Sequence, residues 1–200
     1  MAIHRSKKLG VVTLLATVLV LGLSVITPSV LLPHRSVDDP RTVLLIDHGT
    51  HSSLVIETSA GEMVRYAYGD MRYYAERDTS LASGAAALFV PTQATLGRAE
   101  LQGPALSSAL LSQLNVGIER IHELKVQGES ADRLMEDLDR VFWAGADQHK
   151  NVGAYGLVFA PHPDPYFWGN NSSTMVADWL RALGVTVLGW GLLASWYVVH

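Results

Sequence analysis

The chain has 200 residues, a formal net charge of −4 and no cysteine. This length allows one ordinary domain with an appendage. The slightly acidic balance provides no basic surface, which argues against a nucleic-acid partner. The lack of cysteine excludes disulfides, thiolate metal sites, a lipidated cysteine and a cysteine nucleophile.

The N-terminal region is strongly apolar. Residues 10–32 carry no charged side chain, and this stretch is long enough to cross the hydrocarbon core of a bilayer. Basic residues within 1–9 predict that the N-terminus stays in the cytoplasm. We therefore expect a transmembrane signal anchor at 10–32, a polar linker at 33–41 and a single-pass membrane protein whose C-terminal domain is extracytoplasmic. A cleaved signal peptide is the alternative.

Residues 42–184 contain the elements of one domain. Apolar and alternating patterns predict strands at 42–46, 51–57 and 63–68. Further expected elements are a partly helical stretch at 72–88, a strand at 95–101 and a short helix at 104–111. A strand is expected at 116–126, where Ile121 is out of phase with the alternation and permits a bulge. A helix at 131–143, capped by Ser130, follows it. This order predicts an α+β fold with a small, mostly antiparallel sheet.

Residues 169–184 combine a polar turn with an amphipathic helix, in which apolar side chains recur at three- and four-residue spacing. We expect Ser172 or Ser173 to cap the start of this helix and Gly184 to end it. Residues 185–200 are apolar but short for a membrane span. We expect them to pack on the domain, with contact to the membrane surface as the alternative.

Polar groups at three places have the chemistry of a hydrolase. His48 and His51 precede a strand, and an imidazole suits a general base because its pKa lies near neutral pH. Ser172 begins a helix whose free amides can hold an oxyanion. Asp70 follows a strand and can orient an imidazole. The alternatives are a polar loop for the histidines, a helix cap for Ser172 and a turn carboxylate for Asp70.

Other site classes lack their motifs. The sequence has no Gly-x-Ser-x-Gly elbow, no dinucleotide-binding glycine motif and no P-loop. His48, His51, His162 and Asp164 have side chains that bind zinc, but their spacing is not diagnostic. We therefore expect neither a metal nor a cofactor.

Three segments in the same order resemble the uncharacterised DUF2459 family. They are residues 48–56 (HGTHSSLVI), 66–74 (YAYGDMRYY) and 172–184 (SSTMVADWLRALG). That family is similar to circularly permuted NlpC/P60-type papain-like folds, in which a histidine-bearing strand precedes a helix that begins with the catalytic cysteine. By position, the resemblance gives His51 as the base, Ser172 in the nucleophile position and Asp70 as the group that orients the histidine.

The resemblance implies two alternative functions. The first is a hydrolase or acyltransferase acting on amide or ester bonds of cell-envelope peptides or lipids, with Ser172 as the nucleophile. A cysteine attacks as a preformed thiolate, whereas the Ser172 hydroxyl must lose its proton during attack. The second function is therefore a catalytically inactive pseudoenzyme that binds an envelope ligand or a protein partner in the same cleft.

Overall fold

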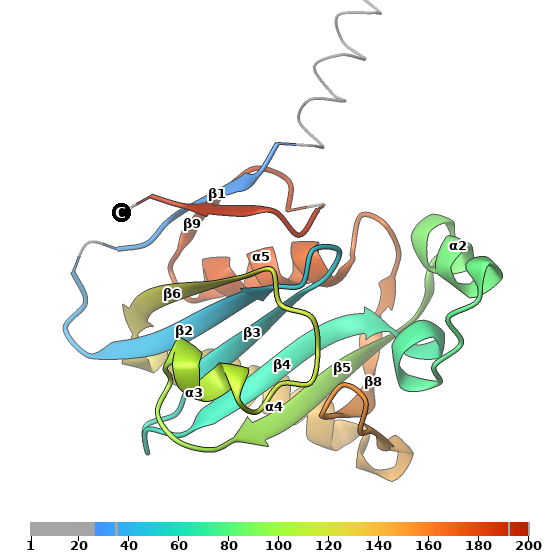
Figure 1. Ribbon diagram of the computed structural model, residues 1–200, viewed down its shortest axis with the longest axis horizontal. Coiled ribbons are helices and arrows are strands. Elements are labelled where there is room, and N and C mark those ends of the chain that lie inside the picture. Colours follow the sequence, from blue (N-terminus) through green and yellow to red (C-terminus); the bar gives the residue numbers. More distant parts are fainter. Residues whose placement is uncertain (1–26, 35, 192, 200) are drawn as a thin grey trace, which may run out of the picture.

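Two β-sheets organise the computed structural model, which describes residues 27–34, 36–191 and 193–199 (Figure 1). The larger sheet has seven strands in the order β6-β2-β3-β4-β5-β8-β7, and all its neighbouring strands are antiparallel. Its strands are β2 (Pro40–Asp47), β3 (Ser52–Glu57), β4 (Met63–Asp70), β5 (Thr92–Leu101), β6 (Arg120–Gln127), β7 (Lys150–Val152) and β8 (Leu157–Tyr166). The predicted α+β class with mostly antiparallel pairing is confirmed, although the sheet is larger than expected.

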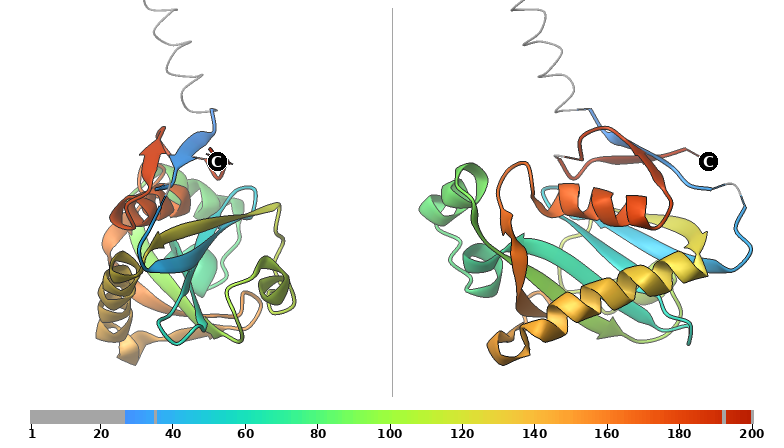
Figure 2. Two further views of the ribbon diagram at one scale, coloured as in Figure 1. Left: turned by 90° about the vertical axis from the view of Figure 1, so that its left-hand side faces the viewer. Right: turned by 180° about the vertical axis from the view of Figure 1, so that it is seen from behind.

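Helices cover the two faces of this sheet unequally. They are η1 (Met71–Ala75, a π-helix), α2 (Leu81–Phe89), α3 (Ser107–Leu111), α4 (Gly128–Ala144), η2 (Ala146–Gln148) and α5 (Ser172–Ala182). The long helices α4 and α5 lie on one face, and the short α3 lies on the other (Figures 1 and 2). We call these the α4/α5 face and the α3 face. The helical stretch expected at 72–88 is divided between η1 and α2.

Strand β4 is buried on both faces of the sheet, so its alternating side chains enter different hydrophobic clusters. Tyr66 and Tyr68 belong to the main core beneath α4 and α5. Met63 and Ala67 point to the α3 face, where they belong to two separate, smaller clusters. Arg65 lies between these two residues on the same face and is also buried.

The N-cap of helix α5 lies at least one residue earlier than expected. Asn171, rather than Ser172 or Ser173, is the N-cap, and its side chain accepts hydrogen bonds from the backbone N–H groups of Ser173 (2.9 Å) and Thr174 (3.1 Å). The Thr174 hydroxyl oxygen accepts from the Asn171 backbone N–H in return, which completes a capping box. Ser172 is therefore the first residue of the helix.

Helix α4 also starts earlier than the sequence suggested. It begins at Gly128, so Ser130 lies inside its first turn and does not cap it. Strand β6 runs directly into the helix and pairs with β2 without a break in register from Gln127 to Arg120. The permitted bulge is therefore absent from this pair, and Ile121 packs against the smaller cluster on the α3 face.

The predicted membrane anchor requires correction. Its residues 10–26 lie outside the described residues, but Ser29–Leu32, at its outer end, form strand β1. This strand lies between β9 (Thr186–Leu188) and β10 (Trp196–Val198) in a small sheet. Within residues 27–34, 36–191 and 193–199, no helix has the length and apolar character needed to cross a membrane. The predicted single-pass membrane location is contradicted by this finding.

Candidate functional site

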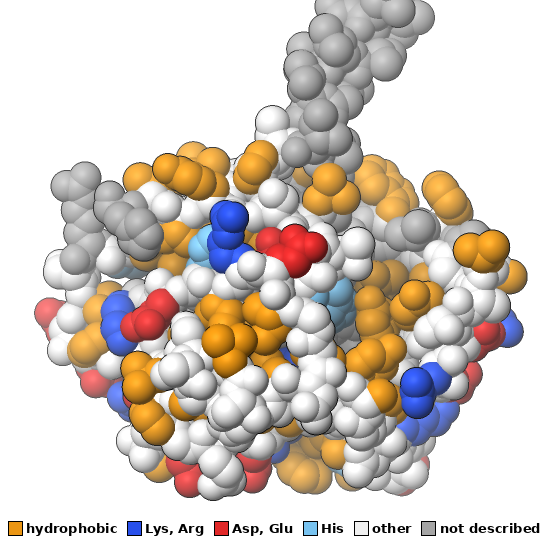
Figure 3. Space-filling model, in the orientation of Figure 1, with side chains coloured by type: hydrophobic (Ala, Val, Ile, Leu, Met, Phe, Trp, Pro, Cys, Tyr) orange, Lys and Arg blue, Asp and Glu red, His pale blue; other side chains and the backbone are white. Residues whose placement is uncertain are grey.

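A cavity of about 290 Å³ opens on the α3 face of the large sheet. His48, His51 and Arg65 supply its basic groups, and Tyr73, Tyr74, Tyr155 and Phe159 supply aromatic walls. In Figure 3, histidine side chains lie in a hollow near the centre of this face, with hydrophobic side chains between the hollow and α2. We call this cavity the Arg65 pocket.

Arg65 is the charged centre of the pocket, with a relative exposure of only 3%. Its Nε donates to Ser53 Oγ (3.3 Å), one terminal nitrogen donates to the Tyr155 carbonyl oxygen (3.0 Å), and the other lies 3.4 Å from His48 Nε2. All three partners are uncharged at neutral pH, and no carboxylate of the described residues forms an ion pair with Arg65. Burial lowers the pKa of Arg65 to about 10, so the guanidinium still carries its charge at neutral pH.

His48 holds the Arg65 side chain from the loop after β2. Its Nδ1 lies 2.6 Å from the Gly117 carbonyl oxygen, and its Nε2 lies 2.9 Å from Ser53 Oγ. A carbonyl oxygen can only accept, so Nδ1 carries the proton and Nε2 is an acceptor. Burial, followed by the charge of Arg65, lowers the pKa of His48, although the Gly117 carbonyl and Asp47 oppose this shift. The ring is therefore neutral at pH 7.

His51 is the one imidazole of the pocket without a protein partner on a buried nitrogen. Its Nδ1 is inaccessible to solvent and has no hydrogen-bond partner among the described residues. The ring packs 4.9 Å from Tyr74 and 6.0 Å from His48, between ring centres. Burial, together with the proximity of His48 and Arg65, lowers the pKa of His51 to about 3. His51 is thus a neutral imidazole whose buried Nδ1 has no partner among the described residues.

Tyr74 reaches the pocket because the strand below it has no side chain at one position. A Cβ atom at Gly69 would collide with the Tyr74 ring, so glycine at the end of β4 lets the ring lie directly over the strand. Burial raises the pKa of Tyr74 and keeps its hydroxyl protonated. The ring gives the pocket an apolar wall with a polar tip.

Ser172 lies away from this pocket. Its relative exposure is 2%, and it does not line the Arg65 pocket. The backbone N–H of Ser172 faces the hydroxyl of Tyr166, which lowers the pKa of that tyrosine against the larger opposing effect of burial. Among the described residues, no hydrogen bond joins Ser172 to His51 or Asp70.

The residue next to His51 contacts α5 instead. Ser52 Oγ lies 3.4 Å from Ser173 Oγ and accepts a hydrogen bond of 3.0 Å from the Trp196 indole nitrogen. Neighbouring strand residues point to opposite faces. Ser52 is therefore directed to the α4/α5 face, and His51 packs on Tyr74, whose ring contacts the cluster on the α3 face.

Asp70 acts as a helix cap in the structure. Its carboxylate accepts from the Tyr73 backbone N–H (2.7 Å) and from the Thr92 hydroxyl. These bonds begin η1 and fix it to β5. Asp70 lines a second cavity beside α2, which does not include His51.

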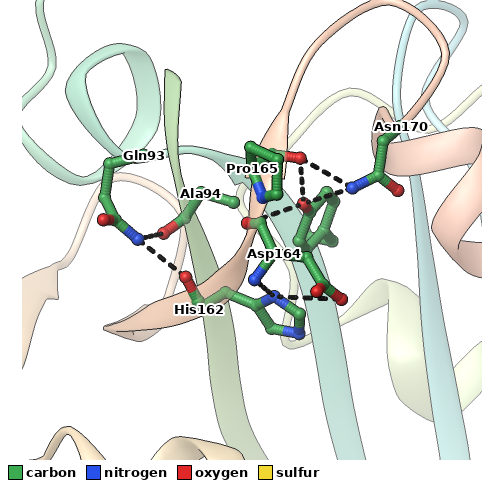
Figure 4. Close-up of polar contacts among 7 residues, drawn as sticks. Gln93, Ala94, His162, Asp164, Pro165 and Asn170 are labelled. Carbon is green, nitrogen blue, oxygen red and sulfur yellow. Dashed lines mark hydrogen bonds and ion pairs between the residues drawn. The ribbon is translucent and has the colours of Figure 1, made fainter. Parts of the chain in front are cut away.

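His162 and Asp164 belong to another polar network, at the end of β8 (Figure 4). His162 Nδ1 accepts from the Asp164 backbone N–H at 3.1 Å, and its ring lies edge-on to Tyr68. Gln93 donates to the carbonyl oxygens of His162 and Ala94, where the pairing of β5 and β8 shifts register. Within the described parts of the chain, no cluster of three or more His, Asp or Glu side chains has the arrangement of a metal site.

The importance of Arg65 was missed in the sequence because its environment depends on strand pairing. Its cross-strand neighbours are Val55 on β3 and Ala99 on β5, neither of which can form an ion pair. The available signal was a cation in the centre of an otherwise uncharged, alternating strand. The sequence pattern predicts His48 as a general-base candidate alongside His51, and it does not indicate the contact between His48 and Arg65.

The structure thus defines an α+β domain with a cationic, aromatic-walled pocket on one sheet face. No family model matches the sequence, and the searches of curated proteins and of solved structures also give no match. The resemblance to the DUF2459 family therefore stays a prediction.

Proposed function

We propose that this domain binds a small organic carboxylate in the Arg65 pocket. The observation that carries the proposal is the buried guanidinium of Arg65, which forms no ion pair with any described residue. An isolated buried charge costs several kcal/mol even after relaxation of the surroundings. A bound anion would offset this cost by supplying the missing counter-charge.

The donor arrangement supports a carboxylate. A guanidinium has five N–H donors in a planar fork, and three of them are directed at Ser53, Tyr155 and His48. The remaining donors suit the paired oxygens of a carboxylate, which arginine binds in a bidentate manner. His51 lines the same pocket as a neutral imidazole and adds no charge to it.

The charge of the pocket supports a monoanion over a phosphate. Arg65 is its one charged group at neutral pH, because the pKa values of His48 and His51 are both lowered by burial. One positive charge balances one carboxylate. A phosphate carries between one and two negative charges at neutral pH and would leave excess charge in a buried site.

Ligand titration of the full-length protein tests the proposal. We expect butanoate to shift the NMR signals of residues around the pocket and to raise the melting temperature. In Arg65→Met, we expect its affinity to fall by about 100-fold, because charge-assisted hydrogen bonds are lost. Arg98→Met is the matched control, since Arg98 is also a strand arginine but forms an ion pair with Asp139 on the other face. Equal binding to wild type and Arg65→Met would refute the proposal, as would binding of inorganic phosphate in place of butanoate.

The papain-like arrangement and the hydrolase function form a second proposal. Its support is that α5 packs on β3, the strand that directly follows His51, with Ser172 as the first residue of that helix. The burial of Ser172 ranks this proposal second, because a nucleophile must be reached by its substrate. Labelling of wild type by a fluorophosphonate probe, lost in Ser172→Ala, would support it. Folded wild-type protein that takes no label would count against it.

A further inference from the structure

A second cavity adjoins the Arg65 pocket. It has a volume of about 490 Å³ and lies between α2, η1 and the end of β8. Thr50, Tyr73 and Tyr74 line both cavities, so the two spaces are neighbours at these residues. We call the second cavity the α2 groove.

The α2 groove is mainly apolar. Leu81, Ala87 and Phe89 line one side of it, and the ring of Tyr73 lines another. Helix α2 contains no charged residue from Leu81 to Phe89. The groove has one carboxylate, that of Asp70, and both its oxygens already accept hydrogen bonds from Tyr73 and Thr92.

Two large side chains of α2 are poorly covered by the protein itself. Leu81 has a relative exposure of 94%, and Phe89 has one of 80%. Exposed apolar side chains beside a groove are typical of a surface that a partner covers. Figure 1 shows α2 at the margin of the domain, away from the helices that cover the main core.

We infer that the α2 groove holds the hydrocarbon chain of the same ligand whose carboxylate binds Arg65, so the ligand is a linear aliphatic acid. This inference rests on the proposed function and adds the chemical class of the ligand. The adjacency of the two cavities carries it, because the charged Arg65 lines one of them and the apolar side chains of α2 line the other. A linear amphipathic acid matches both ends at once, whereas a short acid leaves the groove empty.

A series of acids tests this inference by isothermal titration calorimetry, from butanoate through hexanoate and octanoate to decanoate. We expect the affinity of wild type to rise by up to about fourfold for each added methylene, because this is the gain when a methylene is fully buried from water. Nonyltrimethylammonium carries an alkyl chain of the same length with the opposite charge, and we expect it to bind at least about tenfold more weakly than decanoate, because it is repelled by Arg65.

Gly84→Leu blocks the groove without straining the backbone. A Cβ at Gly84 would lie 3.7 Å from the Tyr73 ring, an ordinary contact, and leucine favours a helix more than glycine does. We expect the dependence of affinity on chain length to disappear in this variant. Leu111→Ser, on α3, is the control for Phe89→Ser, because each removes an exposed apolar side chain, and Leu111→Ser should keep the wild-type dependence.

The outcomes separate the two proposals. If butanoate binds through Arg65 but longer acids bind no better, or if Gly84→Leu keeps the chain-length dependence, the inference about the groove is wrong and the carboxylate site stands. If decanoate binds equally well to Arg65→Met, the proposed function is wrong as well. A dimer that Phe89→Ser dissociates, with unchanged decanoate binding, would assign the groove to self-association and overturn the inference.

Discussion

Each face of the large sheet carries a strand arginine, and the partners of these two arginines differ in charge. On the α4/α5 face, Arg98 of β5 donates to Asp139 of α4 at 2.8 Å and 3.3 Å, and Asp139 also accepts from the Tyr66 hydroxyl at 2.5 Å. On the α3 face, Arg65 of β4 has only uncharged partners. The charge of Arg98 is therefore balanced within the fold, whereas the charge of Arg65 has no counter-charge among the described residues.

The same contrast holds for smaller polar groups. Ser52, Ser173 and Trp196 join β3, α5 and β10 by hydrogen bonds in a buried network. On the other face, the buried Nδ1 of His51 has no partner in the described chain. Buried polar groups without partners destabilise a fold and commonly mark a functional site. The unpartnered His51 Nδ1 agrees with the proposal that the α3 face carries the binding site, although the buried Nε of Arg41, on the α4/α5 face, also has no partner among the described residues.

Replacement of the ion-paired Arg98 should cause the largest change in the free energy of unfolding. Arg98→Met should lower the free energy of unfolding by about 2–3 kcal/mol, because it leaves Asp139 and Tyr66 without their cation. Urea denaturation at pH 7 measures this loss. A loss below about 0.5 kcal/mol, as for a surface ion pair, would show that the α4/α5 face is no better satisfied than the other.

Lowering the pH should decrease the free energy of unfolding, because His51 is buried as a neutral imidazole. The folded pKa of His51 is about 3, below the value near 6.5 of an unfolded histidine, so the unfolded chain binds the extra proton as the pH falls. Its stabilising contribution is complete above pH 6.5 and decreases towards pH 3. Between pH 7 and pH 5 we expect His51 to account for a loss of about 1–2 kcal/mol.

Comparison of wild type with His51→Gln by denaturation at both pH values isolates this effect from that of His48, whose pKa is also lowered. Glutamine does not titrate, so the variant should lose less stability between the two pH values. An equal loss in both proteins would contradict the assignment to His51.

Replacement of Arg65 should not lower the free energy of unfolding, in contrast to replacement of Arg98. Without ligand, we expect Arg65→Met to leave stability unchanged or to raise it by about 1 kcal/mol, because a buried charge is replaced by an apolar side chain of similar length. Thermal unfolding in an anion-free buffer measures the difference. A loss of stability like that of Arg98→Met would show that Arg65 is chiefly a structural residue.

The smallest effects should separate the two residues at the start of α5. Asn171→Ala removes the capping box and should cost about 1 kcal/mol. Ser172→Ala should change stability by less than about 0.5 kcal/mol, since its side chain is not the cap. Denaturation curves of the two variants, recorded together, check the order. A larger loss for Ser172→Ala would indicate an additional role for its hydroxyl.

Local patterns predicted the regular elements well. The alternation from Met63 to Tyr68 corresponds to β4, and Gly184 ends α5 with φ +84°. The backbone N–H groups of Gly184 and Val185 donate to Arg181 and Leu180, so the helix closes with a Schellman motif. These features depend on neighbours a few residues apart, which a sequence displays directly.

The remaining errors concern choices that only the fold decides. Asn171, Ser172 and Ser173 are all good caps, and the backbone path selects the first. The uncharged residues Ser29–Leu32 suited the end of a membrane span, but their partners lie in β9 and β10. The role of Arg65 required knowledge of its neighbours on two other strands, and the placement of Ser172 relative to His51 required knowledge of the face on which each lies.

The pairing of β1 has a consequence for the order of folding during synthesis. Its partners, β9 and β10, are the last strands of the described chain, so β1 leaves the ribosome long before either of them. Until then its backbone donors and acceptors are unpaired, and contacts across such a large sequence separation form slowly. An unpaired strand can associate with other chains. The small sheet is thus the last part of the described fold able to close, and a nascent chain that stalls before Thr186 exposes β1 to aggregation.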